Sequence, residues 1–146
     1  MLQPLRKLLG LSPRDWRDLV RAQAALARAQ WRLRRAPIGQ LAIREVIRPD
    51  QVRGDPVRAR ALALATERVA ANGLLRPLCL VRAIALRDLL LADGIVGASI
   101  RVGVRRRNGL FEAHAWVRWG DAVLGDRPEL VAQFMEVEDL GVLGRP

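Results

Sequence analysis

The fold of this chain is decided by residues 100–119, which have the sequence IRVGVRRRNGLFEAHAWVRW. Apolar and polar residues alternate on both sides of Asn108-Gly109, and this pattern predicts two antiparallel strands joined by a two-residue turn. Such a turn pairs Arg107 with Leu110, and counting back along the strands places Gly103 opposite His114. We expect the small glycine to leave space beside the imidazole.

A third strand is predicted over residues 122–125, after a turn at Gly120-Asp121. A two-residue turn there would set Arg127 opposite His114 and direct Asp126 to the other face of the sheet. A three-residue loop over 119–121 would instead place Asp126 directly opposite His114, where its carboxylate could accept an imidazole N–H. A contact between His114 and Asp126 therefore requires an odd-length loop or a bulge, for which Gly120 is suited.

Three helices are predicted before the strands, over residues 12–35, 55–73 and from about 77 to 94. Ser12-Pro13 and Asp55-Pro56 are typical helix starts, and Asn72-Gly73 is a pair suited to a left-handed cap. The third helix is apolar on most sides, so we expect it to be central. The expected packing positions of the first helix are Trp16, Leu19, Val20, Ala27 and Trp31. Helices followed by an antiparallel meander indicate an α+β fold.

The length of 146 residues fits a single domain, 1–146, with a helical portion over 1–73 and the candidate site in 74–146. Arginines interrupt every apolar run before it reaches the ~18 residues of a membrane span. The start of the chain has no sustained signal-peptide core, and a single cysteine excludes an intramolecular disulfide framework. These features predict a cytoplasmic protein without a membrane partner.

The net charge is +10, and Lys7 is the only lysine, so arginine supplies nearly all of the positive charge. Such a surface could bind nucleic acid, an anionic membrane or an acidic protein segment. The arginines are scattered, however, and the largest cluster is Arg105-Arg106-Arg107. A merely solvated basic surface is therefore as well supported as a binding surface.

The only cysteine, Cys79, and the only histidine, His114, are candidate catalytic residues together with Asp126. A thiolate nucleophile needs a base to take its proton and a carboxylate to orient that base. The helix start at Cys79 supplies unpaired N–H groups and a positive dipole end, which favour a thiolate and could stabilise an oxyanion. The alternative is a buried core cysteine and a strand histidine that is merely hydrogen-bonded.

Four stretches carry a resemblance to a known family: CLVRA at 79–83, IRVGV at 100–104, GLFEAHAWV at 109–117 and VLGD at 123–126. From about residue 75 to 134 the chain resembles the lasso-peptide biosynthesis leader peptidases of the transglutaminase-like superfamily. The resemblance implies that residues 74–146 form a transglutaminase-like catalytic core. It also implies that Cys79 is the nucleophile, His114 the general base and then acid, and Asp126 the orienting carboxylate.

The reaction that the resemblance implies is hydrolysis of the amide bond between a leader peptide and its core peptide, with no metal and no organic cofactor. Because the first ~70 residues are predicted to be helical, the chain is similar to the stand-alone type and not to members with a fused winged-helix-like module. The stand-alone type works with a separate leader-recognition protein. It delivers the core peptide to an ATP-dependent lasso cyclase that forms the macrolactam.

Two other functions stay open from the sequence. A transglutaminase-like acyltransferase would use the same three residues, with an amine in place of water resolving the thioester. A noncatalytic basic helical module that binds nucleic acid would tolerate loss of Cys79 and would bind less tightly as salt rises. The arginines do not concentrate on one recognition helix, which disfavours the nucleic-acid module.

Overall fold

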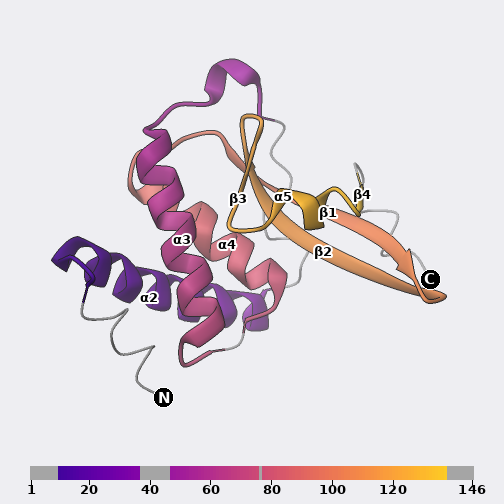
Figure 1. Ribbon diagram of the computed structural model, residues 1–146, viewed down its shortest axis with the longest axis horizontal. Helices are drawn as coiled ribbons and strands as arrows, with labels where there is room; N and C mark the ends of the chain where they lie inside the picture. Colours follow the sequence, from indigo (N-terminus) through magenta and orange to yellow (C-terminus); the bar gives the residue numbers. More distant parts are fainter. Residues whose placement is uncertain (1–9, 37–46, 76, 138–146) are drawn as a thin grey trace.

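The computed structural model describes residues 10–36, 47–75 and 77–137 (Figure 1). Residues 1–9, which make up most of the amino-terminal segment without a signal-peptide core, lie outside these ranges. No helix within them is long and apolar enough to cross a membrane. The elements in chain order are α2 (Pro13–Arg35), η2 (Pro49–Gln51), α3 (Pro56–Asn72), α4 (Cys79–Ala92), β1 (Ala98–Arg107), β2 (Leu110–Trp119), β3 (Ala122–Leu124), α5 (Pro128–Val131) and β4 (Met135–Glu136).

The fold is α+β, as the sequence predicts, with a helix that begins at Cys79 packed on an antiparallel sheet of order β3-β2-β1-β4. Helix α4 contacts α2 and α3 as well as β1 and β2, so it is the central helix. The β1–β2 hairpin projects beyond the three long helices (Figure 1). The residues of α4 that are buried between these layers are Val81, Ala83, Ile84, Ala85, Leu86, Leu89 and Leu90.

Helix α2 begins as predicted, because Ser12 and Asp15 form a capping box in which each side chain accepts the other's backbone N–H. The Ser12 hydroxyl also donates to the Asp15 carboxylate, and this hydrogen bond, followed by that from the Ser12 backbone N–H, holds the pKa of Asp15 below its ordinary value. The predicted packing face is mostly wrong. Leu19 packs against the core, but Ala27 is exposed, and Trp16, Val20 and Trp31 are 46%, 66% and 54% exposed.

The buried face of α2 consists of Asp18, Ala22, Ala25, Leu26 and Ala29. Small alanines let α3 and α4 approach the helix closely, and the carboxylate of Asp18 is buried because Arg58 of α3 binds it with two hydrogen bonds. Four of these five residues are apolar, so the large exposed side chains of the helix point to the wrong face, and a polar contact from another helix adds Asp18 to the right one.

Helix α3 starts at its predicted cap, where Asp55 accepts the N–H of Val57 over 2.9 Å. At its other end Gly73 has φ −82° and ψ −170°, so the predicted left-handed cap is wrong. The glycine is needed for space instead. A Cβ there would lie 2.4 Å from the Val69 carbonyl oxygen and 2.6 Å from Gln23 Oε1.

The predicted register of the β1–β2 hairpin is confirmed: Arg107 pairs with Leu110, and Gly103 pairs with His114. Asn108 and Gly109 have φ values of 51° and 78°, as a two-residue type I′ turn requires. The space above Gly103 is occupied, however. A Cβ at Gly103 would lie 2.7 Å from the ring of Trp116 and 2.8 Å from Cβ of Phe134.

The second turn has two residues, because Trp119 pairs with Ala122 and Val117 pairs with Leu124. The loop is therefore the two-residue alternative, and not the odd-length loop that a contact between His114 and Asp126 was expected to require. Gly120 has φ 59°, and no extra residue is inserted. After β3 the chain forms α5 and then β4, which pairs with β1 at Gly103 and Val104. Neither α5 nor β4 was predicted.

Candidate active site

His114 and Asp126 are in direct contact, although the second turn has the length that was expected to separate them. His114 Nε2 lies 2.5 Å from Asp126 Oδ2, and the two side chains are only 15% and 11% exposed. The expectation failed because it assumed that the β2–β3 ladder continues to residue 126. Strand β3 ends at Leu124, and Gly125 with φ 73° turns the chain so that Asp126 reaches the imidazole.

The carboxylate of Asp126 is held at both oxygens. Oδ2 accepts the imidazole N–H, and Oδ1 accepts the backbone N–H of Arg127 over 2.8 Å. With Nε2 facing a carboxylate, neutral His114 carries its proton on Nε2 and leaves Nδ1 unprotonated. Nδ1 is therefore the nitrogen that can take a proton from a nucleophile.

Two aromatic rings fix the imidazole from its own face of the sheet. The ring centroid of Phe134 lies 5.2 Å from that of His114, and the ring of Trp116 lies 6.2 Å away in a stacked arrangement. Trp116 is nearly fully buried, and the guanidinium of Arg105 covers the Phe134 ring at 4.5 Å. The alternation of β2 puts Trp116 on the face of His114, so that contact was foreseeable. The contribution of Phe134 depends on the unpredicted segment after β3.

Cys79 is a free, partly exposed thiol at the first position of α4. It lines one cavity with Asp126 and with Thr66, Arg82, Ala83, Leu86, Ala115, Trp116, Val117, Leu124 and Gly125. The structure thus joins His114 to Asp126 and places Cys79 and Asp126 on one cavity. No hydrogen bond between described residues joins the thiol to His114, a contact that often tightens only when substrate binds.

Among the described residues, no side chain caps the start of α4. Its N-cap residue, Leu78, has no side chain that can accept a hydrogen bond from the first turn. The backbone N–H groups at Cys79 and beyond are therefore available to an oxyanion that forms beside the thiol. In the described ranges, no group of three His, Cys, Asp or Glu side chains is arranged to hold a metal ion.

Alanine at Gly125 is expected to cost about 1–2 kcal/mol of stability, since it places a side chain at φ 73°. Its Cβ would also lie 2.6 Å from Leu86 Cδ2, so either the end of that side chain or the turn must shift, and a shift of the turn moves Asp126 away from His114. Urea unfolding and peptide-cleavage rates check both effects. Gly94→Ala is the matched control, because Gly94 also has φ 73° but has open space around it. Equal activity losses in the two variants would contradict the expectation.

Comparison with protein families shows what this arrangement is similar to. The family model described as "Transglutaminase-like superfamily" matches residues 10–139. The match includes helices α2 and α3, and so extends further toward the amino terminus than the resemblance of residues 75–134. Comparisons with curated proteins and with solved structures find no match.

Proposed function

We propose that this chain, which belongs to the transglutaminase-like superfamily, is a cysteine peptidase that cleaves the leader peptide from a lasso-peptide precursor. Membership is consistent with a cysteine peptidase or with an acyltransferase. The observation that carries the proposal is the partly buried pair of His114 and Asp126, with Asp126 on the cavity that Cys79 lines. The choice of a lasso-peptide precursor rests on the resemblance of CLVRA at 79–83 and GLFEAHAWV at 109–117.

In the proposed reaction, His114 Nδ1 takes the proton of the Cys79 thiol as the sulfur attacks the scissile carbonyl carbon. Backbone N–H groups at the start of α4 bind the resulting oxyanion. The C–N bond then breaks, and the imidazolium gives its proton to the leaving amine. Water, deprotonated by the same nitrogen, attacks the thioester, and the thiol leaves with its proton restored. Asp126 stays ionised throughout and holds the ring by Nε2.

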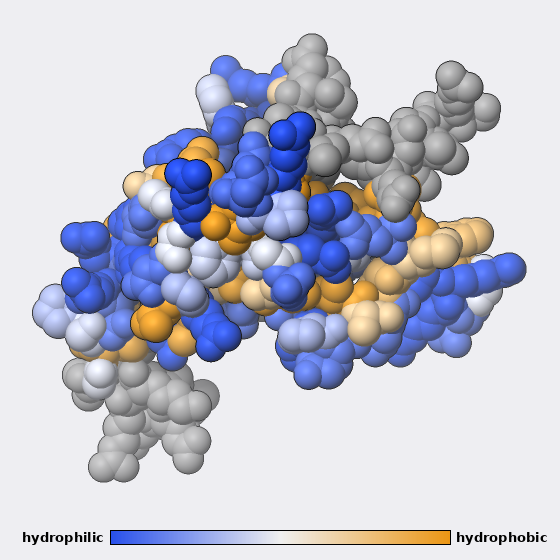
Figure 2. Space-filling model, turned by 90° about the horizontal axis from the view of Figure 1, so that it is seen from above, coloured by the Kyte–Doolittle hydropathy of each residue, from blue (hydrophilic) through white to orange (hydrophobic). Residues whose placement is uncertain are grey.

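The basic surface fits a further part of the proposal. At the projecting end of the hairpin, Arg106 and Arg107 lie beside Leu110 and Phe111, which are 71% and 78% exposed. Figure 2 shows orange hydrophobic side chains next to blue hydrophilic ones at this end. We propose that positive charge favours association with an acidic leader or with the leader-recognition protein, ahead of transfer of the core to the lasso cyclase.

The proposal is tested by incubating a leader-bearing precursor with the protein, with and without a leader-recognition protein, and recording mass spectra. Wild type is expected to give two fragments whose masses sum to that of the precursor plus one water. Cys79→Ala is expected to cleave at least about 10³-fold more slowly, because the thiol forms the covalent intermediate. Cleavage that is slower at high ionic strength would support the charge-based association.

Three outcomes separate the functions. Equal cleavage by wild type and Cys79→Ala would rule out the thiol mechanism. A product that carries an added amine in place of water would identify an acyltransferase. Salt-sensitive binding to nucleic acid that Cys79→Ala does not change, without any cleavage, would identify the noncatalytic module.

A further inference from the structure

The turn that brings Asp126 to His114 is held by helix α4. Arg82 Nη2 donates a hydrogen bond to the carbonyl oxygen of Gly125 over 3.1 Å, across 43 residues of sequence. Leu86 contacts the same glycine, since a Cβ there would lie 2.6 Å from Leu86 Cδ2. Cys79, Arg82 and Leu86 follow one another at spacings of three and four, so they share one face of the helix. One face of α4 therefore carries the thiol and contacts the residue before Asp126.

Arg82 differs from the arginines that stabilise the helices. Arg58 is bound by two carboxylates, Asp18 and Asp93, and Arg32 is paired with Asp88. Within the described ranges, no ion pair joins the partly buried Arg82 to a carboxylate, whereas its buried Nε without a hydrogen-bond partner is a feature that it shares with Arg32. An arginine that serves only stability is normally paired when it is taken out of water. The contact of Arg82 with Gly125 and with the cavity of Cys79 therefore calls for another reason.

We propose that Arg82 is a positioning residue that keeps Asp126 on His114 by holding the Gly125 carbonyl. Without this hydrogen bond the turn at Gly125 relaxes so that strand β3 continues. Because successive side chains of a strand point to opposite faces, the register of β2 and β3 then directs Asp126 to the other face of the sheet. His114 then loses the acceptor at Nε2, and its proton distributes over both nitrogens. Only the catalytic consequence rests on the proposed function, because the position of Asp126 is measurable without substrate.

The test uses the single histidine of the chain, which gives one imidazole signal set in ¹⁵N NMR spectra. At alkaline pH, where imidazole is neutral, wild type is expected to show the Nε2–H tautomer with a hydrogen-bonded proton. Arg82→Met is expected to lose this signature, as is the control variant Asp126→Ala. Arg82→Lys is expected to keep it in part, since an ammonium group can donate to the same carbonyl. An unchanged wild-type signature in Arg82→Met would overturn the proposal.

Cleavage kinetics give the second measurement. Arg82→Met is expected to lower kcat by about 10²-fold, the scale of a misplaced catalytic group, with KM little changed. Arg82→Lys is expected to recover much of this loss. If Arg82→Met does not fold by circular dichroism, Arg82→Gln, whose side chain is too short to reach the carbonyl, replaces it. If wild type cleaves no peptide but Arg82→Met still loses the tautomer, the proposed function fails and the positioning role stands.

Discussion

Asparagine in place of Asp126 is expected to lower kcat for peptide cleavage by about 10³- to 10⁴-fold while the fold stays intact. The change removes the negative charge that stabilises the imidazolium, at 2.5 Å from His114 Nε2. It also offers an amide N–H₂ that can bind an unprotonated Nε2, which moves the imidazole proton to Nδ1. A protonated Nδ1 cannot take the proton of the Cys79 thiol, so nucleophile activation fails even though the side-chain shape is conserved.

Steady-state kinetics of precursor cleavage check this expectation. Asp121→Asn is the matched control, since Asp121 is an exposed acid in the turn between β2 and β3 and is expected to leave kcat unchanged. The double variant Cys79→Ala/Asp126→Asn is expected to be no slower than Cys79→Ala alone, because residues that act as one unit are not additive. Activity within tenfold of wild type for Asp126→Asn would remove Asp126 from the catalytic machinery.

The sequence predicts those parts of the site that local chemistry determines. Asn108-Gly109 dictates a two-residue turn, and that turn with the alternation on both sides is sufficient to pair Gly103 with His114. Pro77 and the long apolar run after it likewise locate Cys79 at a helix start. Each of these features depends on residues within a few positions of one another.

The path of Asp126 could not be predicted in the same way. Counting pairs from the second turn assumes a continued ladder, whereas the ladder ends at Leu124 and the next residues are held by Arg82, more than 40 positions earlier. The packing face of α2 was missed for a related reason. Asp18 is buried because Arg58 of another helix binds it, and the hydrophobic pattern of α2 does not reveal that partner.

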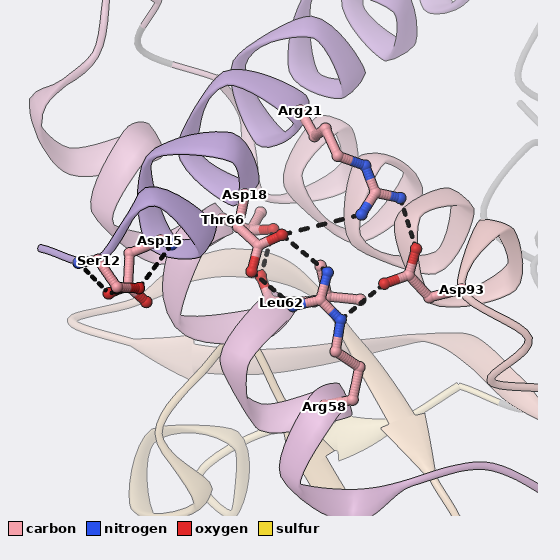
Figure 3. Close-up of polar contacts among 8 residues, drawn as sticks. All are labelled: Ser12, Asp15, Asp18, Arg21, Arg58, Leu62, Thr66 and Asp93. Carbon is pink, nitrogen blue, oxygen red and sulfur yellow. Dashed lines mark hydrogen bonds and ion pairs between the residues drawn. The ribbon is translucent and has the colours of Figure 1, made fainter.

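The ion-pair network of Asp18, Arg21, Arg58 and Asp93 leads to the largest expected effect on stability. Figure 3 shows Arg58 between Asp18 and Asp93, with Arg21 reaching toward both carboxylates. The hydrogen bonding that Arg58 donates to the Asp18 carboxylate is the main cause that raises the pKa of Arg58 above its ordinary value, against the effect of burial. The Asp18 side chain is only 4% exposed, and both of its carboxylate oxygens accept hydrogen bonds from Arg58. The network ties α2, α3 and the end of α4 together.

Arg58→Met is expected to lower the free energy of unfolding by about 3–5 kcal/mol, because it leaves a buried carboxylate without its main partner. Urea unfolding measures the loss. Arg60→Met, the same substitution at an exposed position of α3, is the control and is expected to change stability by less than about 0.5 kcal/mol. Arg58→Met/Asp18→Leu is expected to recover most of the loss, since apolar packing can replace a buried ion pair. Equal losses in Arg58→Met and Arg60→Met would show that the network contributes no stability.

The decrease of the free energy of unfolding at acidic pH gives a second, independent test of this network. The hydrogen bond from Arg21, followed by that from Arg58, holds the pKa of Asp93 below its ordinary value, although burial opposes the shift. A carboxyl whose folded-state pKa is depressed contributes stability above its unfolded pKa of about 3.9, and this contribution is lost as pH falls through the folded-state pKa. Asp93→Asn is therefore expected to be less stable than wild type at neutral pH, and the difference is expected to shrink below about pH 4, where wild type binds the proton that asparagine cannot bind. A difference in urea unfolding that stays constant from neutral pH to pH 3 would show that the ionised form of Asp93 does not hold the end of α4 to Arg21 and Arg58.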